Sequence, residues 1–268
     1  MRLVPPRLAL ASLLALVPLH GAHAQLAVPD TFTNLKVLPK DITKEQLLGT
    51  MRAFTGALGV RCDYCHAEKK GEAANAPGVM PGAPPRPRLD FPSDDKKEKR
   101  IARGMLKMVR AVNGECLARI PELADTGSIP RVQVQCVTCH HGTALPQTLA
   151  DVLARDVATK GVAAAVQHYQ QLKTEYYGSG AYDFREGSLE MLATQLSAGG
   201  KADDALAILD LAAQEFPQSG VVPFVRGEVL LKKGDRAGAI AAYQRALELQ
   251  PRNEAARRRL AELQGQTQ

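Results

Sequence analysis

Residues 186–219 read EGSLEMLATQLSAGGKADDALAILDLAAQEFPQS, and residues 220–253 read GVVPFVRGEVLLKKGDRAGAIAAYQRALELQPRN. The positions that recur, with a period of 34 residues, are small residues or proline: Ala193 and Gly227, Gly200 and Gly234, Ala205 and Ala239, Ala212 and Ala246, and Pro217 and Pro251. Small side chains allow two helices to approach closely, and proline cannot continue a helix. Each stretch is therefore predicted to be a helix–turn–helix closed by its proline.

This period and these small residues resemble the tetratricopeptide repeat. The resemblance implies a helical solenoid over residues 149–268, with residues 151–176 as a degenerate earlier unit and residues 252–263 as a capping helix. The Trp that is usual in the first helix of a unit is missing, and Leu209 stands where the family usually has an aromatic residue, a position that Tyr243 fills in the next repeat. The alternative is a generic amphipathic α-hairpin.

Upstream of the repeats, apolar periodicity predicts two further helices. One runs from about residue 43 to 58 and begins with the capping-box pair Thr43 and Gln46, and the other runs from about residue 95 to 113. Their apolar stripes are Leu47, Met51, Phe54 and Leu58 on the first helix, and Ile101, Met105, Met108, Val109 and Val112 on the second. Residues 73–92, rich in proline, predict an extended loop. The chain is thus predicted to be all-α.

The motif C-x-x-C-H occurs twice, once after each of these helices. In an exported protein it is the attachment signature of c-type haem. On one helical turn the two sulfurs fall on the same side and form thioethers with the haem vinyl groups, and the adjacent His places a ring nitrogen under the iron. The sequence therefore predicts two covalently attached haem c groups with their iron, held by Cys62, Cys65, His66, Cys136, Cys139 and His140.

Paired cysteines also serve other chemistries. A zinc site would need ligands from pairs far apart in the sequence and would leave each His without a role, and a thioredoxin-like pair would need a βαβ context. A disulfide within one motif would close an unusually small ring. Haem attachment is the interpretation that uses every residue of both motifs. The fifth cysteine, Cys116, is predicted to be a buried small apolar residue, with a free thiol that pairs between molecules as the alternative.

Each iron needs a sixth ligand or keeps an open site. Histidine is scarce, because His20 and His23 lie in a predicted signal peptide, His141 is tied beside His140, and His168 lies in the repeat region. Methionine is better supplied, on the apolar stripes of both helices that precede the motifs. We therefore expect His/Met ligation at both irons.

Residues 37–62, with VLPKDI and LGVRC, and residues 93–142, with SDDK, ARGMLKMV and HHG, resemble the cytochrome subunit of photosynthetic reaction centres. In that family each haem unit is a helix that carries the distal Met, a connection, and the C-x-x-C-H turn. The family's subunit typically holds four haems, whereas this chain has two motifs and a repeat region. We therefore expect a related two-haem module that serves another respiratory chain.

The same resemblance implies distal ligands. Met51 would bind the first iron and Met105 the second. Met108, one turn further on, is the second choice for the second iron, and Met80, in the proline-rich loop, is a rival to Met51.

The first residues predict a secretory signal peptide over 1–24. Arg2 and Arg7 precede a short apolar run, and Ala22-His23-Ala24 ends it. The alternative, an uncleaved anchor helix, would need about twenty apolar residues, more than this run offers. No cysteine near the cleavage point could accept a lipid. The mature chain is expected to be periplasmic, without a membrane span.

Composition limits the remaining classes. The 268 residues are 45% hydrophobic and 23% charged, which is typical of a soluble globular chain and excludes a multi-span membrane protein. The net charge of +6 is modest, and the basic residues are not interleaved with aromatics, so nucleic acid is not an expected partner. Aromatic residues make up only 4%, which two haem macrocycles and close helix pairing through Ala and Gly would explain.

Together these features predict a signal peptide at 1–24, a dihaem cytochrome domain at 25–148 and a helical repeat domain at 149–268. The expected function is one-electron transfer rather than enzymatic turnover. The repeats are expected to dock a redox partner, such as a membrane-bound electron-transfer complex, or to mediate self-association. The alternatives are a peroxidase-like haem enzyme with one open iron site, and a scaffold or assembly factor in which haem is structural.

Overall fold

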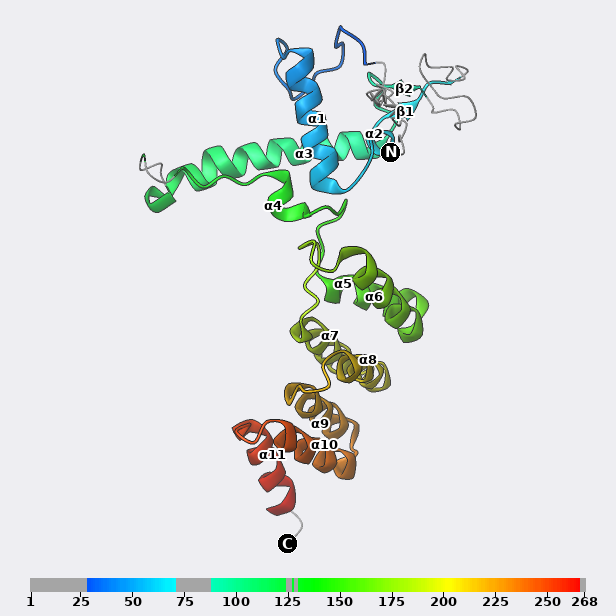
Figure 1. Ribbon diagram of the computed structural model, residues 1–268, viewed down its shortest axis with the longest axis vertical. Coiled ribbons are helices and arrows are strands. Elements are labelled where there is room, and N and C mark those ends of the chain that lie inside the picture. Colours follow the sequence, from blue (N-terminus) through cyan, green and yellow to red (C-terminus); the bar gives the residue numbers. More distant parts are fainter. Residues whose placement is uncertain (1–27, 71–87, 124–126, 128–129, 266–268) are drawn as a thin grey trace, which may run out of the picture. The chain divides into compact units, whose positions relative to one another are not determined.

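The computed structural model describes residues 28–70, 88–123, 127 and 130–265. The predicted signal peptide and Met80 lie outside them. The described residues belong to two compact units, one drawn from Met1–Lys40 and Asp63–Arg103, the other from Asp41–Cys62 and Gly104–Gln268. Helices dominate the regular structure (Figure 1), which confirms the all-α prediction.

Helix α1, Lys44–Leu58, begins where the capping box predicts. The Gln46 backbone N–H donates to Thr43 Oγ1 at 3.2 Å, and the Thr43 N–H donates to Gln46 Oε1 at 3.1 Å. The helix ends at Gly59, whose φ of 64° lies in the left-handed region that glycine adopts without a steric penalty. Its sequence signals therefore set both ends of α1.

The first C-x-x-C-H motif forms the short helix α2, Cys62–Cys65. Directly after it, strand β1, Ala67–Glu68, pairs antiparallel with strand β2, Leu89–Asp90, in the register Ala67 to Asp90 and Glu68 to Leu89. The prediction of one extended loop over 73–92 is therefore wrong at its C-terminal end. A two-residue strand has too little periodicity to be recognised from sequence, so only the pairing reveals it.

Helix α3, Lys97–Ala111, is shorter than predicted and continues as the π-helical turn η1, Val112–Cys116. The Asn113 side chain fixes this turn: its Nδ2 donates to the Val134 carbonyl oxygen, and its Oδ1 accepts from the Val134 N–H, both at 2.8 Å. The 3₁₀ turns η2, Leu117–Arg119, and η3, Pro121–Leu123, follow. The second motif forms helix α4, Cys136–His140.

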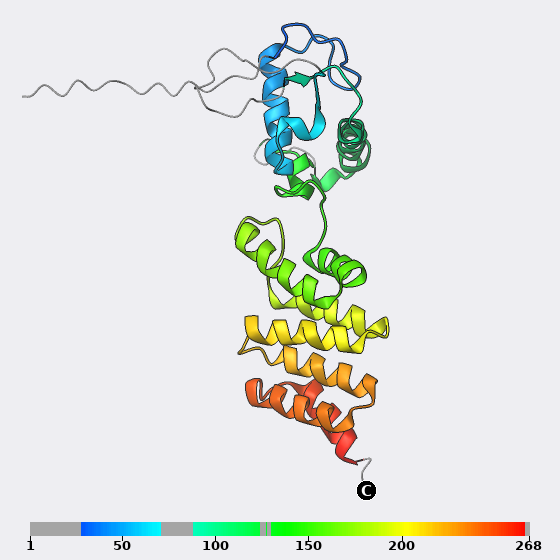
Figure 2. The same cartoon turned by 90° about the vertical axis from the view of Figure 1, so that its right-hand side faces the viewer.

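The repeat region is a stack of paired helices (Figure 2). Helix α5 packs with α6, α7 with α8, and α9 with α10, while α11 packs on α10. The bounds are Leu149–Lys160 for α5, Val162–Tyr176 for α6, Glu186–Ala198 for α7, Ala202–Glu215 for α8, Val221–Lys233 for α9, Arg236–Leu249 for α10 and Glu254–Gly265 for α11. The two predicted repeat units, the earlier hairpin and the final capping helix are all confirmed.

The repeated small residues lie between these helices. Ala193, Ala205, Ala212, Ala239 and Ala246 are all fully buried, with an exposed fraction of 0%. Close packing through alanine leaves little room for large side chains, so even the low aromatic content suffices to fill this core.

One pair of neighbouring positions changes together between the two repeats. Ala193 and Leu209 of the first unit correspond to Gly227 and Tyr243 of the second. A Cβ atom added to Gly227 would lie 2.4 Å from Cε1 of the buried Tyr243 ring. The smaller residue on α9 thus makes space for the larger one on α10.

The part of the chain before α5 has a much thinner apolar core. Among its described residues, the buried apolar side chains are Leu47, Ala57 and Leu89. Helix α3 has no buried residue, and Ile101, Met105 and Met108 on its apolar stripe are 53%, 41% and 49% exposed. Within the described residues, no helix combines the length and apolar character needed to span a membrane.

Candidate functional site

The ring of His140, which ends the second motif, is oriented by the turn that follows α4. His141 has φ of 47° and turns the chain back, and the Thr143 N–H and hydroxyl both donate to the His140 carbonyl oxygen at 2.8 Å. His140 Nδ1 then lies 2.9 Å from the Thr143 carbonyl oxygen. Because a carbonyl can only accept, Nδ1 carries the proton, and the Nε2 lone pair stays available to a metal.

Helix α1 packs against this second motif rather than standing alone. The Gly142 N–H donates to the Ala57 carbonyl oxygen at 2.9 Å. A Cβ atom on Gly59 would lie 2.0 Å from the Gly142 carbonyl oxygen, so the backbone contact requires glycine there. The end of α1 and the turn after His140 are therefore held together through main-chain contacts.

A cavity of about 420 Å³ opens between these elements. Its lining is almost entirely small and aliphatic: Ala53, Gly56, Ala57, Val109, Val134, Gln135, Cys136 and Val137. The first three residues are one helical turn of α1, where the lack of large side chains leaves a flat wall. An apolar slot that has a cysteine of the motif in its wall fits the edge of a flat hydrophobic macrocycle.

Helix α3 contributes Val109 to this lining, and the two candidate methionines lie at different angles from Val109 around the helix. Met105 precedes Val109 by four residues and so shares its face, whereas Met108 is one residue away and lies about 100° around the helix. Both methionines are exposed in part, at 41% and 49%.

In the first motif, the His66 ring packs edge-on against Phe91, with ring centroids 4.9 Å apart. Strand β1 begins directly after His66 and β2 ends directly before Phe91, so the two-stranded ladder brings the rings together. His66 Nδ1 is buried without a hydrogen-bond partner among the described residues. An orphaned buried imidazole nitrogen in a haem-attachment motif fits a ring that is held for metal ligation.

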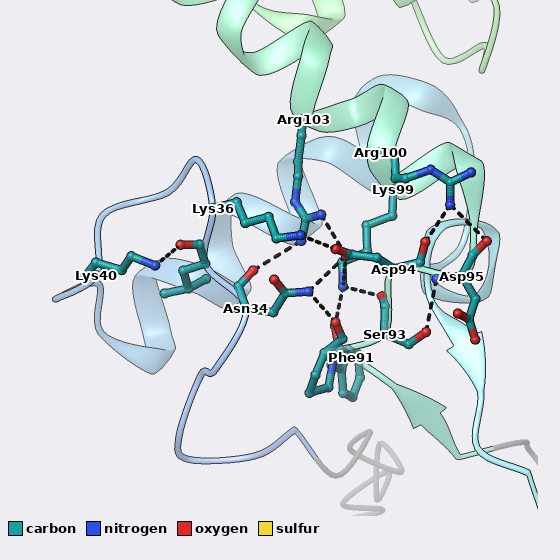
Figure 3. Close-up of polar contacts among 12 residues, drawn as sticks. Asn34, Lys36, Lys40, Phe91, Ser93, Asp94, Asp95, Lys99, Arg100 and Arg103 are labelled. Carbon is teal, nitrogen blue, oxygen red and sulfur yellow. Dashed lines mark hydrogen bonds and ion pairs between the residues drawn. The ribbon is translucent and has the colours of Figure 1, made fainter.

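Basic residues surround this site and converge on one carboxylate, Asp94 (Figure 3). Lys36 Nζ lies 2.6 Å from Asp94 Oδ2, and Arg103 NH1 lies 2.7 Å from Oδ1. Asn34 Nδ2 donates to Oδ1 at 2.9 Å. The hydrogen bond from Lys36, followed by that from Arg103, holds the pKa of Asp94 well below its usual range. Asp94 is therefore ionised at neutral pH and organises the cations around it.

The electrostatics keep His66 neutral. Burial and the nearby Lys99 cation lower its pKa to about 4, with a smaller contribution from Arg103 and an opposing effect of the Phe91 backbone. A neutral imidazole is the form that binds metals.

The two halves of the chain each match a known family. Residues 84–192 match the family model described as photosynthetic reaction centre cytochrome C subunit, and residues 227–268 match that of the TPR repeat. The chain thus joins a reaction-centre cytochrome c domain to a tetratricopeptide repeat. The resemblances inferred from the motifs and from the 34-residue period are confirmed.

Two curated relatives are similar to part of the chain. Cytochrome c-554 of Chloroflexus aurantiacus is 33% identical over 87 residues, 32% of this chain and 15% of the relative. The photosynthetic reaction center cytochrome c subunit of Thermochromatium tepidum is 30% identical over 120 residues, 44% of this chain and 22% of the relative. The chain spans less than a quarter of either relative's length. Its relationship to c-type cytochromes implies covalently bound haem c.

Among solved structures, Naa15/Naa10 bound to HypK-THB matches 45% of this chain and 17% of that chain, at 25% identity and a TM-score of 0.31. A score this low does not indicate a common fold.

Three other residues of the sequence analysis have clear positions. Met51 is half-buried on α1, in the second compact unit, whereas His66 belongs to the first. Cys116 is exposed, so the prediction of a buried residue is wrong: the π-helical turn carries it to the surface. His168 is engaged away from both motifs, where its Nδ1 pairs with the Asp156 carboxylate.

The positioning residues of both motifs escaped the sequence analysis. Thr143 orients His140, Phe91 packs on His66, and Asp94 gathers the cations. Each acts through a contact with a backbone atom or a ring that no motif specifies. No disulfide joins the cysteines in the described ranges, and no group of three or more His, Cys, Asp or Glu there could hold a metal ion by itself.

Proposed function

We propose that this protein is an exported cytochrome that carries two covalently attached haem c groups and transfers single electrons between partner proteins. The observation that carries the proposal is the His140 ring, whose Nδ1–H is fixed by the Thr143 carbonyl so that Nε2 is free for iron. When bound, haem supplies a one-electron Fe(III)/Fe(II) couple. The chain's part is to attach, orient and shield that group.

The proposed ligands follow the two motifs. Cysteine sulfurs form the thioethers, one imidazole in each motif is the proximal ligand, and a methionine from the preceding helix is the distal one. The sets are Cys62, Cys65, His66 and Met51 for the first haem, and Cys136, Cys139, His140 and Met105 for the second. Met105 is preferred to Met108 because it shares a helix face with Val109, which lines the cavity. A thioether ligand favours Fe(II) and so raises the reduction potential.

The proposed organisation is a signal peptide at 1–24, a cytochrome domain at 25–148 and a repeat domain at 149–268, in the periplasm. The cytochrome relatives support a membrane-bound electron-transfer complex as partner, since one of them is named a reaction center subunit. The tetratricopeptide repeat supports protein docking or self-association, because stacked helix pairs present extended surfaces.

Haem attachment is tested on the full chain, produced in a host that matures c-type cytochromes. Intact mass and the pyridine haemochrome spectrum should show two haems per polypeptide. The mass should correspond to a polypeptide that begins at Gln25. The double variants C62S/C65S and C136S/C139S should each keep one haem. The matched control Cys116→Ser, which changes an exposed cysteine outside both motifs, should keep two. A purified chain with the bare polypeptide mass would refute the proposal.

The distal ligands are tested by the near-infrared Met–Fe(III) band. Met51→Ala and Met105→Ala should each remove this band from one haem, whereas Met108→Ala, a change of the same type one turn away, should keep both. Loss of the band in Met108→Ala with retention in Met105→Ala would overturn the Met105 assignment. Rapid carbon monoxide binding by the reduced parent at both haems would contradict six-coordinate irons and favour a haem enzyme.

A further inference from the structure

Basic residues gather beside the first motif. Lys96, Lys99 and Arg103 follow one another at a spacing of three and four residues, so at the start of α3 they lie on one helix face. Lys96 Nζ donates to the carbonyl oxygen of Asp63, inside the first motif, at 2.5 Å. This basic face of α3 is therefore directed at the segment that carries His66.

Lys99 is linked to the His66 imidazole through Phe91. Its Nζ donates to the Phe91 carbonyl oxygen at 2.6 Å, and the Phe91 ring packs on the His66 ring. Lys99 Nζ also lies 3.5 Å from Asp94 Oδ1, and Arg103 and Lys36 form ion pairs with the same carboxylate. Three cations, Lys36, Lys99 and Arg103, thus surround one carboxylate, and this cluster carries an excess of positive charge.

A positive local charge acts on a haem iron in a defined direction. Fe(III) carries one more positive charge than Fe(II), so neighbouring cations destabilise the oxidised form and raise the reduction potential.

The second motif has the opposite device. His140 donates its Nδ1–H to the Thr143 carbonyl, a bond that makes the imidazole a stronger electron donor. A more basic ligand stabilises Fe(III) and lowers the potential. At His66 the neighbouring backbone acceptor is the Phe91 carbonyl oxygen, and this oxygen already accepts a hydrogen bond from the Lys99 ammonium, which weakens it as an acceptor for the imidazole.

We propose that the iron of the first motif has the higher reduction potential, and that Lys99 and Arg103 at one site and the Thr143 carbonyl at the other set this order. The inference rests on the proposed function, because it concerns the haems that the motifs would hold. The residues around His66 would thus favour the reduced form of the group that the first motif holds, and the bond at His140 would favour the oxidised form at the second. Lys99, Arg103 and Thr143 are positioning residues, since they act through the imidazoles.

The test is a redox titration of the full dihaem protein, followed by visible absorption and fitted to two one-electron components. Lys99→Gln keeps a hydrogen-bond donor but removes the positive charge. It should lower the higher of the two potentials by about 59 mV, which corresponds to a tenfold change in the oxidation equilibrium. Arg103→Gln should act in the same direction. Thr143→Val, which removes the hydroxyl that fixes the turn, should raise the lower potential. Lys97→Gln changes an exposed lysine two residues from Lys99, about 200° around the helix, and should move neither potential.

Haem content separates the two levels of the argument. If the parent protein itself carries fewer than two haems, the proposed function is refuted. A parent with two haems in which Lys99→Gln and Arg103→Gln lower the lower-potential component, or move neither, overturns the order proposed here and leaves the function intact. A ring ¹⁵N signal of His140 in the reduced protein that shows no Nδ1 proton would also overturn it.

Discussion

Replacing Gly227 with alanine tests how the repeat region is packed. The new methyl group would lie 2.4, 2.7 and 2.8 Å from three atoms of the Tyr243 ring. That ring is fully buried, and its hydroxyl donates to Glu228 at 2.6 Å. Arg259 holds the same carboxylate with two bonds of 2.8 Å, so the ring cannot easily move away.

The expected loss in the free energy of unfolding is the difference between two opposing effects. Overpacking a well-filled core costs about 1–3 kcal/mol, and the contact with three ring atoms places this case in the upper part of that range. Alanine is favoured over glycine within a helix by about 1 kcal/mol. Gly227→Ala should therefore lower the free energy of unfolding by about 1–2 kcal/mol.

The assay is urea unfolding of the full chain, followed by far-UV circular dichroism, with hydrogen exchange of the α9 and α10 amides to localise the effect. A slope of about 2 kcal/mol per molar urea converts the expected loss into a midpoint lower by about 0.5–1 M. The control is Gly187→Ala on α7, where an added Cβ meets no atom within 4 Å. It should leave the midpoint unchanged or raise it slightly.

The preceding repeat supplies the rescue. G227A combined with Y243L recreates the Ala193 and Leu209 pair, so the double variant should be more stable than the sum of the single changes predicts, by about 1 kcal/mol or more. The reasoning is refuted if Gly227→Ala matches the parent in stability, or if the two changes are simply additive.

Three further predictions concern other contacts. Gly59→Ala should reduce haem content from two to one in the pyridine haemochrome assay, because its Cβ would lie 2.0 Å from the Gly142 carbonyl that joins α1 to the second motif; full haem content in this variant would contradict that role. Thr43→Ala should destabilise α1 by about 1 kcal/mol through loss of the capping box, seen as faster amide exchange in its first turn. Burial alone would raise the pKa of Asp156, but the hydrogen bonds and charges of His168 and Lys160 together outweigh it and lower that pKa. Asp156→Asn should therefore reduce stability by about 1–3 kcal/mol above a pH of about 4, and the difference should shrink as the pH falls through the folded-state pKa; a pH-independent difference in thermal unfolding would argue against this linkage.

Local patterns predicted the elements whose cause is local. The 34-residue period fixed the helix pairs of the repeat region, because each position repeats the same packing requirement. The capping box fixed the start of α1 for a similar reason, since its partners are three residues apart. The haem motifs were equally accessible, because attachment needs both sulfurs and the imidazole on one short turn.

Features that depend on distant segments were not predictable. Strand β2 pairs with residues that precede it by a long connection, and Phe91 reaches His66 only through that pairing. The exposed position of Cys116 follows from a π-helical turn that the Asn113 side chain fixes against Val134. Sequence periodicity does not encode such contacts, since each depends on where another segment of the chain comes to lie.

By itself, the sequence determined the helical class and the solenoid of the second half, because helix pairing acts over short stretches. The cysteine and histidine residues proposed to hold two haems stay a prediction. Only the tertiary structure decided that α1 closes on the turn after His140 and that Thr143 sets the proton of that ring. It also decided that the cations at the start of α3 gather at the first motif. The physical reason is that charge and hydrogen bonding act through space, and the distance between two groups is fixed only once the chain is folded.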